Sequence, residues 1–101
     1  MAGIVPVRSM RRMVSKICWV SGRVQGVFYR GTTAGRAREM GITGYARNLP
    51  DGRVEVLAQG PPAVVEDFIK WLWIGSVASK VTAVEVRDVT VTHPREGFTA
   101  E

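Results

Sequence analysis

The sequence has a single cysteine and a single histidine among its 101 residues. The lone Cys18 excludes an internal disulfide and any zinc site that needs several thiolates. Cys18 stands inside a strand pattern, so we expect a small buried side chain and not a nucleophile. His93 lies beside Pro94 near the end of the chain, where we expect it at the surface. Because no cluster of His, Asp or Glu has ligand spacing, we expect no metal and no other cofactor.

Long apolar runs are also lacking. Hydrophobic residues make up 46% of the chain, but no apolar run approaches the about 20 residues that span a bilayer. We therefore expect no membrane partner. The absence of a secretory signal pattern, together with the single cysteine, predicts a cytoplasmic protein. The length suits one compact domain.

The first thirteen residues contain no acid. Arg8, Arg11 and Arg12 supply three of the five net positive charges, which leaves +2 for residues 14–101. Residues 1–13 also lack a clean periodicity, so we predict a flexible basic N-terminal tail at 1–13 and a folded domain at 14–101. Because the basic excess is largely confined to this tail, we expect no nucleic acid as a partner.

Hydrophobic patterning predicts strands at about 16–21, 42–48, 53–59 and 80–91, helices at about 29–40 and 61–74, and a candidate short strand at 97–99. Pro50-Asp51-Gly52 predicts a hairpin between the second and third strands. The expected buried face of the second helix comprises Val65, Phe68, Ile69, Leu72 and Trp73. For the third strand we expect one covered and one partly exposed face. This order predicts an α+β fold, a ferredoxin-like split βαββαβ sandwich with an antiparallel four- to five-stranded sheet and two helices on one face.

A glycine-bracketed loop separates the first strand from the first helix. It reads Gly22-Arg23-Val24-Gln25-Gly26-Val27-Phe28-Tyr29-Arg30. Glycine lets the backbone curl tightly and expose consecutive N–H groups, which can bind an anion. Arg30 then falls in the first helical turn, where the helix dipole disfavours positive charge unless an anion is bound. The pattern therefore predicts a phosphate-binding site.

A second motif follows, and the two motifs together resemble a known family. It reads Gly44-Tyr45-Ala46-Arg47-Asn48-Leu49-Pro50-Asp51-Gly52-Arg53-Val54-Glu55-Val56. In this spacing and element order, both motifs are similar to those of the acylphosphatases, over about residues 15–91. The resemblance implies hydrolysis of the carboxyl–phosphate anhydride bond of small acyl phosphates to carboxylate and inorganic phosphate. One departure is Gly75-Ser76, where family members often carry Gly-Pro.

The resemblance also implies roles for individual residues. Arg30 matches the phosphate-binding arginine, and Asn48 matches the asparagine that orients the attacking water. The backbone N–H groups expected to hold the phosphate oxygens are those of Gly22, Arg23, Val24, Gln25, Gly26, Val27, Phe28 and Tyr29. The chemistry agrees, because arginine grips two phosphate oxygens with a planar fork and a carboxamide both donates to and accepts from water. A carboxylate leaving group has a pKa of roughly 4–5 and needs no general acid.

Little in the motifs would select an acyl group, so acetyl, carbamoyl and glycolytic acyl phosphates are all candidate substrates. Inorganic phosphate or sulfate is expected to occupy the same loop, and we expect a monomer. Two alternatives stay open. An RNA-binding module shares the element order, but such modules stack bases on aromatics in central strands, and residues 53–59 have none. The other is a non-catalytic acylphosphatase-like module, although the chain lacks the cysteine-rich zinc regions that accompany such modules in larger maturation proteins.

Overall fold

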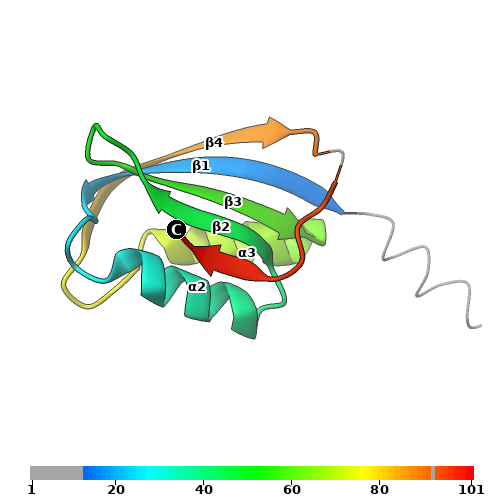
Figure 1. Ribbon diagram of the computed structural model, residues 1–101, viewed down its shortest axis with the longest axis horizontal. Helices are drawn as coiled ribbons and strands as arrows, with labels where there is room; N and C mark the ends of the chain where they lie inside the picture. Colours follow the sequence, from blue (N-terminus) through cyan, green and yellow to red (C-terminus); the bar gives the residue numbers. More distant parts are fainter. Residues whose placement is uncertain (1–12, 92) are drawn as a thin grey trace, which may run out of the picture.

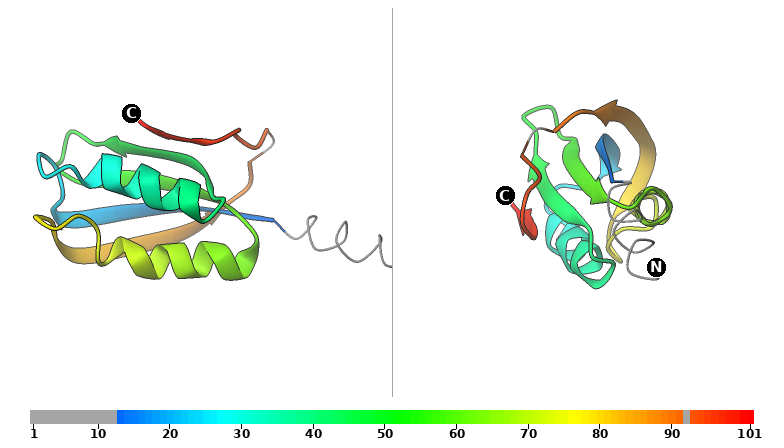
Figure 2. Two further views of the ribbon diagram at one scale, coloured as in Figure 1. Left: turned by 90° about the horizontal axis from the view of Figure 1, so that it is seen from below. Right: turned by 90° about the vertical axis from the view of Figure 1, so that its right-hand side faces the viewer.

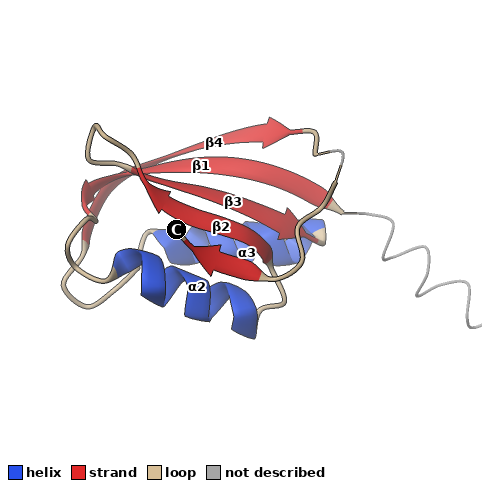
Figure 3. Cartoon of the chain, viewed as in Figure 1, coloured by secondary structure: helices blue, strands red, loops and turns tan. Residues whose placement is uncertain are grey.

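The computed structural model describes residues 13–91 and 93–101, so the predicted tail lies outside the described residues except for Met13. In this part of the chain, two helices cover one face of a five-stranded sheet (Figures 1 and 3). The strands are β1 (Val14–Arg23), β2 (Thr43–Asn48), β3 (Val54–Gly60), β4 (Lys80–Val89) and β5 (Phe98–Ala100), and the helices are α2 (Tyr29–Glu39) and α3 (Pro62–Leu72). This order confirms the predicted ferredoxin-like split βαββαβ arrangement.

The strands lie in the order β4-β1-β3-β2-β5. Each adjacent pair among β4, β1, β3 and β2 is antiparallel, as predicted. The candidate fifth strand forms as well, but it runs parallel to β2, with Gly44 opposite Phe98 and Ala46 opposite Ala100. The chain returns across the end of the sheet after β4 and enters beside β2 in the same direction (Figure 1). The antiparallel description therefore holds for four strands, and the fifth makes the sheet mixed.

The core lies between the sheet and the helices. Alternate residues of two central strands face the helices and are buried, namely Cys18 and Val20 of β1 and Val54, Val56 and Ala58 of β3. The helices cover them with Tyr29, Thr33, Ala34 and Ala37 of α2 and Val65, Phe68 and Leu72 of α3. Figure 2 shows both helices on this one face, with the loop between β1 and α2 at one end of the molecule.

Helix α3 ends earlier than the pattern predicts. The N–H groups of Ile74 and Gly75 both bond to the carbonyl of Trp71, at 2.8 and 3.2 Å, and Gly75 takes a left-handed conformation with φ of 63°. The helix thus ends at Leu72, with Trp73 at its C-cap position. Trp73 is 50% exposed, so its predicted place on the buried face is wrong. Trp71 is partly buried instead and stacks on Phe68, with 6.2 Å between the ring centroids.

The outer face of β3 is covered, whereas the pattern predicts a partly exposed face. Glu55, Leu57 and Gln59 are all buried there. Side chains of the flanking strands close over Glu55, whose carboxylate accepts hydrogen bonds from the Trp19 indole at 3.0 Å and the Tyr45 hydroxyl at 2.6 Å. Arg47 of β2 adds a third hydrogen bond from Nε at 2.9 Å. One carboxylate thus ties together the three middle strands of the sheet.

These contacts make stability depend on the charge of Glu55. Burial by itself would raise the pKa of Glu55, but the hydrogen bonds from Tyr45 and Trp19 and the charge of Arg47 lower it below its ordinary value. The folded state therefore gains stability above the unfolded pKa, and loses it as the pH falls through the folded pKa. We expect Glu55→Gln to lower the free energy of unfolding at neutral pH by about 1–2 kcal/mol and to flatten the acid side of the stability profile.

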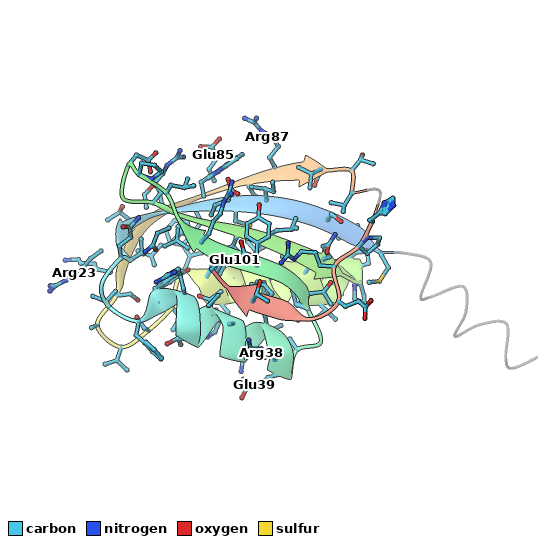
Figure 4. The ribbon with its side chains drawn as sticks, in the orientation of Figure 1. Arg23, Arg38, Glu39, Glu85, Arg87 and Glu101 are labelled. Carbon is cyan, nitrogen blue, oxygen red and sulfur yellow. The ribbon has the colours of Figure 1, made fainter. Side chains whose placement is uncertain are left out.

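Urea unfolding at neutral and acidic pH measures both effects. Glu85→Gln is the matched control, because the Glu85 side chain is 61% exposed and lies 3.7 Å from Arg87 on the edge strand (Figure 4). An exposed pair of this kind contributes about 0–1 kcal/mol, so the control is expected to change little. Equal effects of the two substitutions would show that the Glu55 contacts do not stabilise the sheet.

Candidate active site

The loop between β1 and α2 comprises residues 24–28. It is shorter than the motif suggests, because Gly22 and Arg23 belong to the end of β1 and pair with Val81 and Lys80 of β4. Gly22 is required there, since its φ is 119° and a side chain would collide with the backbone carbonyl of Lys80. The Arg23 side chain points away from the molecule beside the loop (Figure 4). That the N–H groups of these two residues contact phosphate stays a prediction.

Two carbonyl groups of the loop are held by the protein behind it. The Ser76 hydroxyl donates to the carbonyl oxygen of Val27 at 2.8 Å. The carbonyl of Phe28 accepts from the backbone N–H of Thr32 at 3.1 Å and from the Thr32 hydroxyl at 2.9 Å. Because C=O and N–H point in opposite directions across a trans peptide plane, these bonds turn the next N–H groups, those of Phe28 and Tyr29, away from the bonded groups. Ser76 thus helps to hold the loop.

The N-terminal end of α2 is positive and has no internal compensation. Phe28 occupies the N-cap position without a side-chain capping bond, and the first turn contains no acid. The unpaired N–H groups of a helix start and its dipole favour an anion there. Arg30 adds a full positive charge in this same turn. This end of α2 therefore favours negative charge, and the binding of phosphate there stays a prediction.

The loop and Arg30 open into one cavity of about 290 Å³. Its walls are formed by Val24, Gly26, Phe28, Tyr29, Arg30, Gly31 and Ala100. Six of these residues belong to the predicted loop and to the first helical turn, so the structure brings the predicted phosphate-binding groups together. Ala100 comes from β5, which the motifs do not include.

The end of the chain contacts Arg30 directly. Arg30 donates a hydrogen bond from Nη1 to the carbonyl oxygen of Glu101, which Figure 4 shows at the end of β5. The N–H of Glu101 in turn donates to the carbonyl of Ala46 at 2.8 Å. This chain of bonds connects the helix-borne arginine with β2. No motif signals it, because it depends on the parallel pairing of a three-residue strand.

Asn48 is the last residue of β2 and is exposed. It lies on the same sheet face as Ala46, toward the helices, because side chains alternate along a strand. Asn48 is not among the residues that line the cavity. The loop is nevertheless tied to this end of the hairpin, since the Gln25 carboxamide donates to the carbonyls of Leu49 and Arg53 at 2.8 and 2.9 Å. The structure therefore gathers Arg30 and the loop around one cavity, and it places Asn48 at the end of the hairpin that Gln25 contacts, outside the lining of this cavity.

The family model for acylphosphatases matches residues 16–100. The chain belongs to the acylphosphatase family. It is 58% identical to an acylphosphatase from Chromohalobacter salexigens over 67 residues, which cover 66% of this chain and 74% of the relative. It is 52% identical to an acylphosphatase from Alkalilimnicola ehrlichii over 79 residues, or 78% and 88% of the two chains. A solved acylphosphatase structure from Coxiella burnetii superposes with a TM-score of 0.84 at 31% identity, over 90% of this chain and 95% of that one.

The family membership makes this protein an enzyme with acylphosphatase activity, acting on a small acyl phosphate.

Two remaining predictions concern single residues. Cys18 is fully buried, as predicted, and burial raises the pKa of its thiol from 9.0 to about 12. His93 is exposed, also as predicted. Within residues 13–91 and 93–101, no three His, Cys, Asp or Glu side chains come together as metal ligands, and no helix of this part is long and apolar enough to cross a membrane.

Proposed function

We propose that this acylphosphatase binds the phosphate of its substrate with Arg30 and the loop N–H groups, while Asn48 holds the water that attacks phosphorus. The observation that carries the proposal is the convergence of Arg30 and the acid-free first turn of α2 on a single cavity. The water attacks in line with the anhydride oxygen, so that carboxylate leaves and inorganic phosphate forms.

Phosphate binding follows from the donors at this end of α2. The contact with Glu101 uses one N–H group of Arg30, and the others are available for phosphate oxygens. The bidentate grip of a guanidinium orients the phosphate as well as neutralising it. The N–H groups of Phe28 and Tyr29 are oriented through the bonded carbonyls of Val27 and Phe28, so these two groups need no reorganisation when charge spreads over the equatorial oxygens in the transition state.

Water activation needs no titrating group in this proposal. The carboxamide of Asn48 accepts a hydrogen bond from the water and donates one to a neighbouring oxygen, whatever the pH. The leaving carboxylate is stable as an anion, because its conjugate acid has a pKa of roughly 4–5. In agreement, the residues that line the cavity include no carboxylic acid and no histidine.

Phosphate release from acetyl phosphate in the presence of EDTA tests the proposal. We expect steady turnover that EDTA does not reduce, and competitive inhibition by inorganic phosphate and by sulfate. Carbamoyl phosphate and a glycolytic acyl phosphate are expected to be hydrolysed by the same site. Loss of turnover with EDTA, restored by a divalent metal, would contradict the metal-independent mechanism. Absence of turnover with all three substrates would favour the non-catalytic module.

A further inference from the structure

Phe28 is a large apolar side chain left in solvent at the edge of the cavity. It is 80% exposed, although its neighbours Val24 and Tyr29 are buried. Exposed aromatic rings beside a polar binding site are commonly found where the ring contacts a ligand. The proposed mechanism uses only the backbone of Phe28, so the ring has no role in it.

The backbone of Phe28 is also in an unusual conformation. Its φ is 63°, and it is the only residue other than glycine in the described chain with a positive φ. This left-handed conformation is unfavourable for a residue with a bulky side chain. The two hydrogen bonds from Thr32 to its carbonyl oxygen stabilise the conformation. The fold thus holds the Phe28 ring in solvent and its backbone in a left-handed conformation, and both are unfavourable for phenylalanine.

Gly31 leaves room for the ring. A Cβ atom at Gly31 would lie 2.9 Å from Cζ of Phe28, so any larger residue would push the ring away. Glycine in a helix is unfavourable compared with alanine, and Gly31 lies within α2. Strain, exposure and a helix glycine therefore coincide around a single aromatic ring. Departures from local preference that cluster in this way are typical of functional positions.

The cavity has space for more than the phosphate. Its about 290 Å³ is roughly ten times the volume that one water molecule occupies in the liquid. The five heavy atoms of a phosphate group would fill only part of this space. Apart from Arg30, and from Tyr29 whose hydroxyl bonds to Leu72, the residues that line the cavity are glycines or carry apolar side chains. The remaining volume therefore suits an apolar group attached to the phosphate.

We propose that the ring of Phe28, together with Gly31 and Ala100, forms a subsite for the acyl group, which selects acyl phosphates with an aromatic or branched apolar acyl group over those with a small polar one. This inference rests on the proposed function, because the acyl group reaches the subsite only when the phosphate is held by Arg30. The polar carbamoyl group gains nothing from the phenyl ring, whereas a benzoyl group can stack on it or meet it edge to face.

The ratio of kcat/KM for benzoyl phosphate to that for acetyl phosphate tests the subsite. We expect Phe28→Asn to lower this ratio about fivefold to tenfold relative to the unmodified enzyme, because a stacked aromatic contact is lost. Asparagine tolerates the left-handed conformation, and both substrates share the phosphate, so changes at the phosphate site cancel in the ratio. Val77→Asn is the matched control, since Val77 is also an exposed apolar residue but does not line the cavity.

A binding measurement keeps the inference testable if the variant is inactive. Calorimetry with benzoylphosphonate and acetylphosphonate, which are not hydrolysed, should show the same loss of discrimination in Phe28→Asn. An unchanged ratio in Phe28→Asn, or an equal fall in Val77→Asn, would overturn the subsite. If the unmodified protein hydrolyses neither substrate, the proposed function fails, and the ratio of the two phosphonate affinities still decides whether the acyl group contacts Phe28.

Discussion

Arg30→Ala is expected to lower kcat/KM for acetyl phosphate by about 10³-fold or more, which is the scale seen when an arginine that neutralises a transferring phosphoryl group is removed. The loop N–H groups remain, but they carry only partial charges. Arg30 also donates to the carbonyl of Glu101, so its loss removes this contact, whereas the bond from the Glu101 N–H to Ala46 remains. Steady-state phosphate release over a range of substrate concentrations measures the effect.

Two further variants separate charge from geometry at this position. Arg30→Lys keeps the positive charge but loses the planar fork, so we expect it to recover only a small part of the activity. Arg36→Ala removes an exposed arginine from the same helix, which pairs with Glu39 at 3.4 Å, and should leave turnover within about threefold. Equal activity of Arg30→Ala and Arg36→Ala would exclude Arg30 from the site.

Asn48→Ala is expected to lower kcat by about 10²- to 10³-fold, as for other single side chains that organise a reacting group by hydrogen bonding. The phosphate would still bind, but the water would lose its fixed position in line with the leaving group. Asp51→Asn is the control for disturbance of the hairpin. Asp51 lies three residues beyond Asn48 and accepts a hydrogen bond from the backbone N–H of Arg53 at 3.0 Å. A normal kcat for Asn48→Ala would remove this residue from the mechanism.

Local patterns predict the loop and the hairpin because glycine readily takes the positive φ angles that tight turns and helix ends require. Gly26, Gly41 and Gly52 all take positive φ angles where the pattern places a turn or a helix end. The N–H of Gly52 bonds to the carbonyl of Leu49 at 3.1 Å, which closes the predicted hairpin. The unfavourable position of Arg30 in the helix dipole likewise depends only on where α2 begins. These features depend on interactions within a few residues.

Features that depend on distant segments could not be predicted in this way. The direction of β5 depends on the path of the chain after β4, and a three-residue strand has too few residues to show a period. The contact between Arg30 and Glu101 spans most of the chain and follows from that pairing. The hydrogen bond from Ser76 to the carbonyl of Val27 also joins separate loops. The sequence shows Gly75-Ser76 as a departure from Gly-Pro but does not indicate this contact.

The outer face of the sheet shows a similar limit. The third strand has no aromatic residue, which is one reason to expect no RNA binding. The outer face nevertheless carries Trp19 and Tyr45 on the neighbouring strands. Arginine side chains lie over both rings, with Arg87 5.3 Å from the Trp19 ring centroid and Arg47 5.5 Å from that of Tyr45. These arginines are themselves paired with Glu85 and Glu55. Both rings thus take part in contacts within the sheet, and the expected absence of a nucleic-acid partner stays a prediction.

In the proposed mechanism, Arg30 binds the phosphate and Asn48 positions the water that reacts with it. The most direct test is the affinity of each alanine variant for inorganic phosphate, measured by calorimetry beside its kcat. We expect Asn48→Ala to bind phosphate within about threefold of the unmodified enzyme while its kcat falls sharply, and Arg30→Ala to lose phosphate affinity as well as turnover. A loss of phosphate affinity in Asn48→Ala as large as that in Arg30→Ala would contradict this division of roles.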